Sequence, residues 1–163
     1  MFRFVLLTCI AVLFTSIQTK EQNEFSYKDF CQYYGVKDST DDSKAILIEF
    51  WASWCQPCRK INGEISELHN EYRNQSMTIG NGMKVIFVGL DTDSIRWSKA
   101  IRNDRIQWAE HFRDTAKFNS SFLMKNRISY LPMNVLLDSS GQVVSQGLYG
   151  KALRDKLDGF KTK

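Results

Sequence analysis

The sequence predicts one α/β domain with a mixed central sheet and helices on both faces. Two nearly continuous apolar runs, residues 45–51 (AILIEFW) and 84–90 (KVIFVGL), are typical of strands buried on both faces of a sheet. The segment between them has helical periodicity, as in a parallel crossover connection. The turn sequence DSSG at 138–141, between residues 133–137 and 142–146, predicts an antiparallel hairpin near the C-terminus.

Length and composition restrict the class of protein. The chain has 163 residues, a size usual for one domain with its own core. A quarter of the residues are charged, and 11 phenylalanines argue against wholesale disorder. The formal net charge of +4 is small, and the basic residues form no continuous stripe, so we expect no nucleic-acid partner. Four cysteines are too few for a disulfide-dense miniprotein.

The N-terminal segment, residues 1–19, resembles a secretory signal. Arg3 precedes an apolar run from Phe4 to Phe14, and polar residues follow at once. We therefore predict a signal peptide or an uncleaved N-terminal membrane anchor, and a protein exported to the periplasm or another extracytoplasmic space. The competing interpretation is that this run is a buried first strand or helix of the domain.

The remaining elements follow from hydrophobic periodicity and turn signals. Residues 20–44 form a polar N-terminal extension, and residues 45–163 form the domain. Cys58, Ile61, Ile65, Leu68 and Tyr72 recur at helical spacing and predict an amphipathic helix from Pro57 onward. We expect further helices around 27–34, 95–106 and 115–125 and after Gly150, and a polar loop over 75–82.

The main chemical motif is Cys55-Gln56-Pro57-Cys58, where a buried strand gives way to a helix. Unpaired backbone N–H groups and the helix dipole stabilise a thiolate at a helix N-terminus. Cys58 lies one turn further on, within disulfide reach. Pro57 suits the first turn, where a missing N–H has little cost. We expect Cys55 to attack a partner disulfide and Cys58 to resolve the mixed disulfide.

Other interpretations of the two cysteines remain open. A zinc site would need two more ligands, and the two histidines, His69 and His111, are isolated, so we expect no metal. A purely structural disulfide would close a very short loop and stabilise the fold weakly. Substitution of Cys58 by serine would separate a redox enzyme from a non-catalytic docking module.

Two further residues are candidates for the same site. Glu49 lies inside the apolar strand, where burial would raise its pKa and equip it to exchange a proton with Cys58 through water. The alternative for Glu49 is a carboxylate at a strand edge that reaches solvent. Pro132 stands at the head of a strand, and a cis peptide there would place the backbone of Leu131 beside the two sulfurs, ready to pair with a substrate strand.

Together these features resemble the thioredoxin superfamily, and in particular the exported TlpA/ResA-like thiol–disulfide oxidoreductases of the broad AhpC/TSA-like grouping. The resemblance extends from Ala45 to the C-terminus. Its motifs are ILIEFWASWCQPCRK (46–60), VIFVGLDTD (85–93), ISYLP (128–132), NVLLDSSGQVV (134–144) and LYGKAL (148–153).

The resemblance implies a thioredoxin fold with a helical insertion, from Asp93 to about Thr115, before the cis-proline strand. It implies a nucleophilic Cys55, a resolving Cys58 and a buried acid at Glu49. The activity implied is thiol–disulfide exchange with protein partners, with the cysteine pair itself as the redox centre and no other cofactor. We expect a monomeric reductant fed by a membrane electron donor, with cytochrome c maturation as one setting; a disulfide-forming oxidant is the alternative.

Several positions depart from the family pattern. Many relatives carry an acid where Ile61 stands and a proline where Gly63 stands. Peroxidases of the grouping need a threonine at the position of Ala52, so we do not expect a peroxiredoxin. These departures leave the redox potential and the partner undetermined.

Other side chains near the motif have ordinary alternatives. Trp54, Gln56 and Pro57 would shape the docking surface around the disulfide. Cys31, among aromatic residues, is expected to be a small buried apolar residue. Five basic residues of the insertion suggest either a solvated helix face or docking of an acidic partner. They are Arg96, Lys99, Arg102, Arg105 and Arg113.

Overall fold

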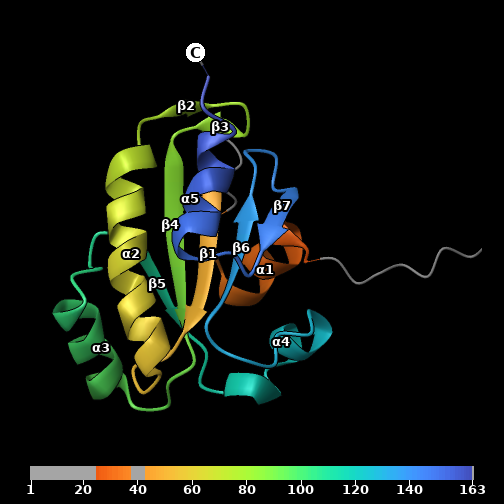
Figure 1. Cartoon of the computed structure of the whole chain (residues 1–163). Coiled ribbons are helices and arrows are strands. Elements are labelled where there is room, and N and C mark those ends of the chain that lie inside the picture. Colours follow the sequence, from red (N-terminus) through yellow and green to blue (C-terminus); the bar gives the residue numbers. More distant parts are fainter. Residues whose placement is uncertain (1–24, 38–42, 163) are drawn as a thin grey trace, which may run out of the picture.

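The computed structural model of the protein describes residues 25–37 and 43–162 (Figure 1). The predicted signal or anchor, residues 1–19, lies outside the described residues. Within the described ranges, no helix has the length and apolar character needed to cross a membrane.

A five-stranded mixed sheet forms the centre of the molecule, in the order β5-β4-β1-β6-β7 (Figure 1). The strands are β1 (Ala45–Trp51), β4 (Met83–Gly89), β5 (Glu110–Arg113), β6 (Met133–Leu137) and β7 (Val143–Gln146). Strands β1, β4 and β5 run parallel, and β6 and β7 are antiparallel to their neighbours. This arrangement confirms the predicted mixed sheet with a C-terminal hairpin.

Strand β1 is buried along its whole length, which explains its continuous apolar sequence. Alternation along the strand points Ile48 and Phe50 to one face of the sheet and Glu49 and Trp51 to the other. The Phe50 ring packs near Phe122, with ring centroids 6.5 Å apart. The two faces of β1 therefore belong to two different packing layers.

Helices cover both faces (Figure 1). Helices α2 (Gln56–Tyr72), α3 (Ser94–Asn103) and α5 (Gly150–Asp158) lie on one side of the sheet. This is the side of Trp51, because ring contacts lead from Trp51 through Phe87 and Trp108 to His69 of α2. Helices α1 (Tyr27–Tyr34) and α4 (Ser121–Lys125) lie on the side of Phe50. The layers enclose a continuous core, as expected for an α/β domain.

Helix α1 belongs to this core, although its residues fall in the segment predicted as an N-terminal extension. Ser26 caps its first turn, and Gly35, with φ 67°, ends it. Phe30 is fully buried, and its ring lies 5.8 Å from that of Phe122 in α4. Cys31 is also buried, as expected.

Some elements differ from the sequence-based expectation. The segment expected as a polar loop over 75–82 contains a small hairpin, β2 (Ser76–Met77) with β3 (Gly80–Asn81). The insertion contains the edge strand β5 as well as α3. The helix expected over 115–125 divides into a 3₁₀ turn, Lys117–Asn119, and the short α4.

Candidate redox site

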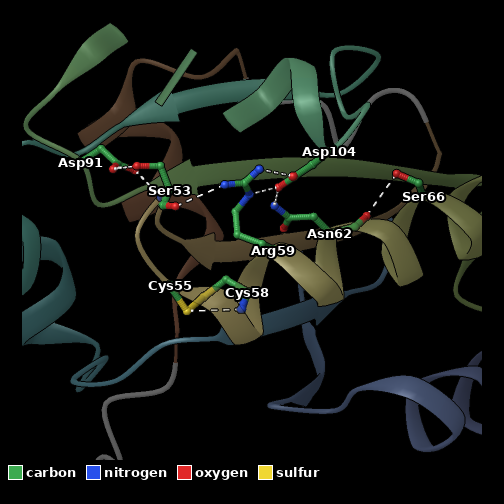
Figure 2. Close-up of polar contacts among 8 residues, drawn as sticks. All are labelled: Ser53, Cys55, Cys58, Arg59, Asn62, Ser66, Asp91 and Asp104. Atoms are coloured by element: carbon green, nitrogen blue, oxygen red, sulfur yellow. Dashed lines mark hydrogen bonds and ion pairs between the residues drawn. A yellow bond between two sulfur atoms is a disulfide. The ribbon is translucent and has the colours of Figure 1, made fainter. Parts of the chain in front are cut away.

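Cys55 and Cys58 form a disulfide at the N-terminus of α2, with Cα atoms 5.3 Å apart (Figure 2). Cys55 is the N-cap of the helix, and Gln56 and Pro57 open its first turn. The backbone N–H of Cys58 donates to the Cys55 sulfur at 3.3 Å. After reduction the same N–H and the helix dipole would stabilise a thiolate on Cys55.

The two sulfurs differ in accessibility. Cys55 is 7% exposed, whereas Cys58 is completely buried. Trp54, immediately before Cys55, is 54% exposed. An incoming disulfide can therefore meet Cys55 first, while Cys58 stays protected behind it.

The loop before Cys55 is held by a buried carboxylate that follows β4. Asp91, only 2% exposed, accepts a hydrogen bond from the Ser53 N–H at 3.0 Å and another from the Ser53 hydroxyl at 2.6 Å (Figure 2). The Arg59 guanidinium donates to the Ser53 carbonyl at 3.3 Å. The backbone leading into the nucleophile is thus fixed from both sides.

Arg59 also connects α2 to the end of α3. It forms a two-pronged ion pair with Asp104, the C-cap of α3, and Asn62 donates to the same carboxylate at 2.8 Å (Figure 2). The Asp104 side chain is 8% exposed and Asn62 is fully buried. A paired carboxylate in such a site is well stabilised, since each oxygen has a donor.

Glu49 is completely buried and, by strand alternation, shares the sheet face of Trp51, which α2 covers; Cys58, in α2, is also completely buried. Neither of its carboxyl oxygens has a hydrogen-bond partner among the described residues. Burial raises the pKa of Glu49 well above its usual range. Asn134 lies directly opposite on β6 and offsets this rise only in part, since its side-chain amide is also bound to the backbone of Leu148. Glu49 is thus no solvated carboxylate at a strand edge.

The segment before β6 lies at the same end of the sheet as the disulfide. Met133 pairs with Phe50 near the end of β1, so Pro132 falls beside the start of the loop that leads to Cys55. The peptide bond between Leu131 and Pro132 is cis. Leu131 is partly buried, and the preceding Tyr130 is 60% exposed. Two exposed aromatic side chains, Trp54 and Tyr130, therefore belong to the segments at this end of the sheet.

Comparison with known proteins decides the family. A family model described as thioredoxin-like matches residues 42–143, well over half of the chain. The chain belongs to the thioredoxin-like family. Helix α1 precedes the matched segment, although it packs into the same core.

Named relatives of this thioredoxin-like chain are redox proteins. It is 26% identical to the thiol-disulfide oxidoreductase ResA of Bacillus thuringiensis (strain Al Hakam), over 74% of this chain and 63% of that protein. It is 31% identical to thioredoxin C-2 of Corynebacterium nephridii, over 76% of this chain and 82% of that protein. A solved thiol-disulfide oxidoreductase from Bacteroides fragilis NCTC 9343 is 29% identical, with a TM-score of 0.63 over 72% of this chain and 81% of that chain. The chain thus spans less than two thirds of the ResA sequence.

The residues that support the thioredoxin-like site were not found from the sequence. Asp91 was not assigned to the site, and Asp93, two residues further on, caps α3. Arg59 and Asn62 had no assigned role, and Asp104 was unnoticed. One signal for Asp91 was available, because polar residues directly after a parallel strand meet at the functional edge of a sheet. Among the described residues, no cluster of three or more potential ligands could hold a metal ion.

Proposed function

We propose that this protein is a thiol–disulfide oxidoreductase that acts on protein partners through Cys55 and Cys58. The observation that carries the proposal is the pair itself, with one accessible and one buried sulfur at the N-terminus of α2. The family match and the named relatives support it.

The proposed reaction consists of two exchanges. The Cys55 thiolate attacks one sulfur of the partner disulfide, and that bond breaks as a mixed disulfide forms. The partner's departing sulfur leaves as a thiolate and takes a proton from solvent. The Cys58 thiolate then attacks Cys55, which releases the second partner thiol and leaves the Cys55–Cys58 disulfide. Two electrons have passed from the protein to the partner.

Glu49 has a role in the second exchange under this proposal. Cys58 must lose its proton inside a buried environment, where neither hydroxide nor buffer has ready access. Burial raises the pKa of Glu49, so its ionised form is a stronger base than a solvated glutamate and can take that proton through water, after which Glu49 holds it. Substitution of Glu49 by glutamine is expected to slow release of the partner while leaving formation of the mixed disulfide intact.

We further propose that the protein works outside the cytoplasm as a reductant. Residues 1–19 have the pattern of an export signal or anchor, which favours a membrane electron donor for recharging. The resemblance to TlpA/ResA-like proteins favours a function such as cytochrome c maturation. Leu131 and Pro132, together with Trp54, Gln56 and Pro57, would then contact the partner.

The reduction potential of the pair tests the direction of electron flow. The full chain would be equilibrated against glutathione and dithiothreitol buffers, and the thiols counted by alkylation. A value near or below about −270 mV, that of thioredoxin, supports a reductant. A value near about −120 mV, that of a strong oxidant, would instead make the protein a disulfide donor. The absence of any two-electron transition would contradict catalysis and leave a docking module.

Trapping tests the assignment of roles. The Cys58→Ser variant should accumulate mixed disulfides between Cys55 and its partners, because the thiol proposed to resolve them has been removed. The Cys31→Ser variant is the matched control and should release partners normally. Equal trapping by both variants would contradict the assigned resolving role of Cys58.

A further inference from the structure

A hollow of about 280 Å³ opens between the loop that precedes Cys55 and helix α3. Trp54 and Ser53 line it from the loop, and Arg59 lines it from α2. Arg96, Lys99 and Ala100 line it from one face of α3, with Asn103 at the end of that face. Trp54 is the residue immediately before Cys55. When a partner cysteine is joined to Cys55, the partner residues on either side of it therefore come within reach of this hollow.

The charges of the lining have one sign. Three cationic side chains border the hollow, and no acidic residue lines it. Arg59 is paired with Asp104. Arg96 forms an ion pair with Asp93 at 3.4 Å, but the two side chains are 82% and 48% exposed, so water screens this pair. Lys99 is exposed and makes no ion pair within the described parts of the chain.

The acidic residues nearby do not cancel this charge at the surface. Asp91 is buried and engaged by Ser53. The Asp104 side chain is 8% exposed and is saturated by Arg59 and Asn62. Asp93 caps α3 with one oxygen and pairs with Arg96 through the other, so it offsets part of the charge of Arg96, whereas Lys99 has no such counterion among the described residues. The outward field at the hollow is therefore positive.

The hollow also has an apolar wall. The half-exposed indole of Trp54 and the buried methyl of Ala100 contribute it. A partner segment would thus meet an apolar contact close to Cys55 and cations further out. Such an arrangement is typical of docking surfaces with an aromatic anchor and a charged rim.

We infer that this hollow docks a partner segment in which acidic residues flank the disulfide to be reduced. The inference rests on the proposed function and adds the class of partner to it. Charge at the rim acts mainly on the rate of encounter, so it selects among partners before the chemical step. The occupant to which the geometry points is an acidic protein segment rather than a small thiol.

The positions of the basic side chains distinguish a docking surface from a basic helix face that is merely solvated. Of the five basic residues in the insertion, only Arg96 and Lys99 line the hollow. Arg102 lies on another face of α3 and donates to Ser98 at 2.8 Å. Arg113 donates to the Thr92 carbonyl at 2.9 Å. A docking role therefore predicts unequal effects of these residues, whereas a solvated face predicts equal ones.

The test compares two cyclic disulfide peptides that differ only in having Glu-Glu or Lys-Lys beside the first cysteine. The pre-reduced full chain would reduce each peptide, and each rate would be divided by the rate with uncharged hydroxyethyl disulfide. For the unaltered protein at low salt we expect about a fivefold preference for the acidic peptide, since exposed ion pairs are individually weak. The preference should shrink as the salt concentration rises.

Charge reversal locates the effect. The double variant Arg96→Glu with Lys99→Glu should abolish or invert the preference. The Arg102→Glu variant keeps the same helix and the same kind of change but alters a residue outside the hollow, and it should retain the preference. Equal loss in both variants, or no preference in the unaltered protein, would overturn the docking surface. Failure to reduce even the uncharged disulfide would instead contradict the proposed function.

Discussion

Glu49 combines features that a folded protein seldom tolerates together. It is fully buried, its oxygens have no hydrogen-bond partner among the described residues, and its cross-strand neighbour Asn134 is committed elsewhere. An ionised carboxylate in that position is costly, so the group remains protonated at pH values where an exposed glutamate is charged. The cost is consistent with a site that must hold a proton rather than with one selected for stability.

The first prediction concerns the pH dependence of stability at this residue. The folded state binds a proton that the unfolded chain releases above about pH 4.5, so stability should fall as pH rises toward the elevated pKa of Glu49. Glu49→Gln removes the ionisable group. At pH 8 this substitution should stabilise the protein by roughly 1.4 kcal/mol for each pH unit by which the pKa of Glu49 in the folded state exceeds its value in the unfolded chain, counted no further than pH 8. At pH 4 the effect of the substitution should be small.

Urea unfolding of the oxidised protein at several pH values would measure this difference. Glu67→Gln, which removes the same charge from an exposed position of α2, is the matched control. If the two variants showed the same pH profile, Glu49 would have to be ionised at little cost.

Sequence reasoning at the residue scale succeeded where the chemistry is local. Cys55, Cys58 and Glu49 lie within ten residues, and an acid inside an apolar strand is conspicuous. Asp91 and Asp104 were not predicted, because the residues that they bind, Ser53 and Arg59, lie 38 and 45 positions away in the sequence. The sequence around an isolated aspartate does not indicate which distant group it will bind.

At the scale of elements, two glycines provide a matched pair. Gly63 lies exposed in the middle of α2, and a Cβ there would meet nothing within 4 Å. Gly82 has φ +100°, and a Cβ there would lie 2.3 Å from the Arg73 carbonyl oxygen. Gly63→Ala should therefore raise the free energy of unfolding by about 0.5–1 kcal/mol. Gly82→Ala should lower it by about 2 kcal/mol or more.

Chemical denaturation of both variants would check these values. A loss of stability in Gly63→Ala would show that α2 needs a glycine for a kink, as its position in the helical pattern first suggests. The same result for both glycines would contradict the assignment of backbone strain to Gly82 alone.

The link between α2 and α3 yields another prediction. Asp104→Ala removes the carboxylate that holds Arg59 and Asn62, and it leaves a largely shielded guanidinium without its counterion. We expect a loss of about 1–3 kcal/mol in the free energy of unfolding. The measurement is again urea unfolding. Asp155→Ala, which breaks the exposed pair with Lys151, should cost no more than about 0.5 kcal/mol.

Elements with strong periodicity were predicted correctly, and weak ones were missed. Strand β1 and helix α2 have long apolar patterns, so β1 has the predicted bounds and α2 begins one residue before its predicted start. Strand β5 has only four residues, EHFR, none of them buried, and its place is decided by pairing with β4. The β2–β3 hairpin is shorter still. Tertiary contacts rather than local propensity form such elements.

At the scale of the whole molecule, α1 completes the core. Its Phe30 is fully buried and packs against α4 on the far side of the sheet from α2. Phe30→Ala should therefore lower the free energy of unfolding by about 3–5 kcal/mol. Gln32→Ala, an exposed position of the same helix, should change it by less than about 0.5 kcal/mol. Thermal or urea unfolding distinguishes them, and equal effects would mean that α1 is only loosely attached.

The placement of α1 has a consequence for chemical selectivity. Cys31 lies in α1, on one side of the central sheet, whereas Cys55 and Cys58 lie on the side of α2. The central sheet therefore separates Cys31 from the disulfide. Among the described residues, a reagent or partner that opens the disulfide finds no further thiol on that side of the sheet, so a rearranged pairing with Cys31 cannot compete. Under the proposed function, this separation would let the protein exchange disulfides with its partners without forming a bond through Cys31.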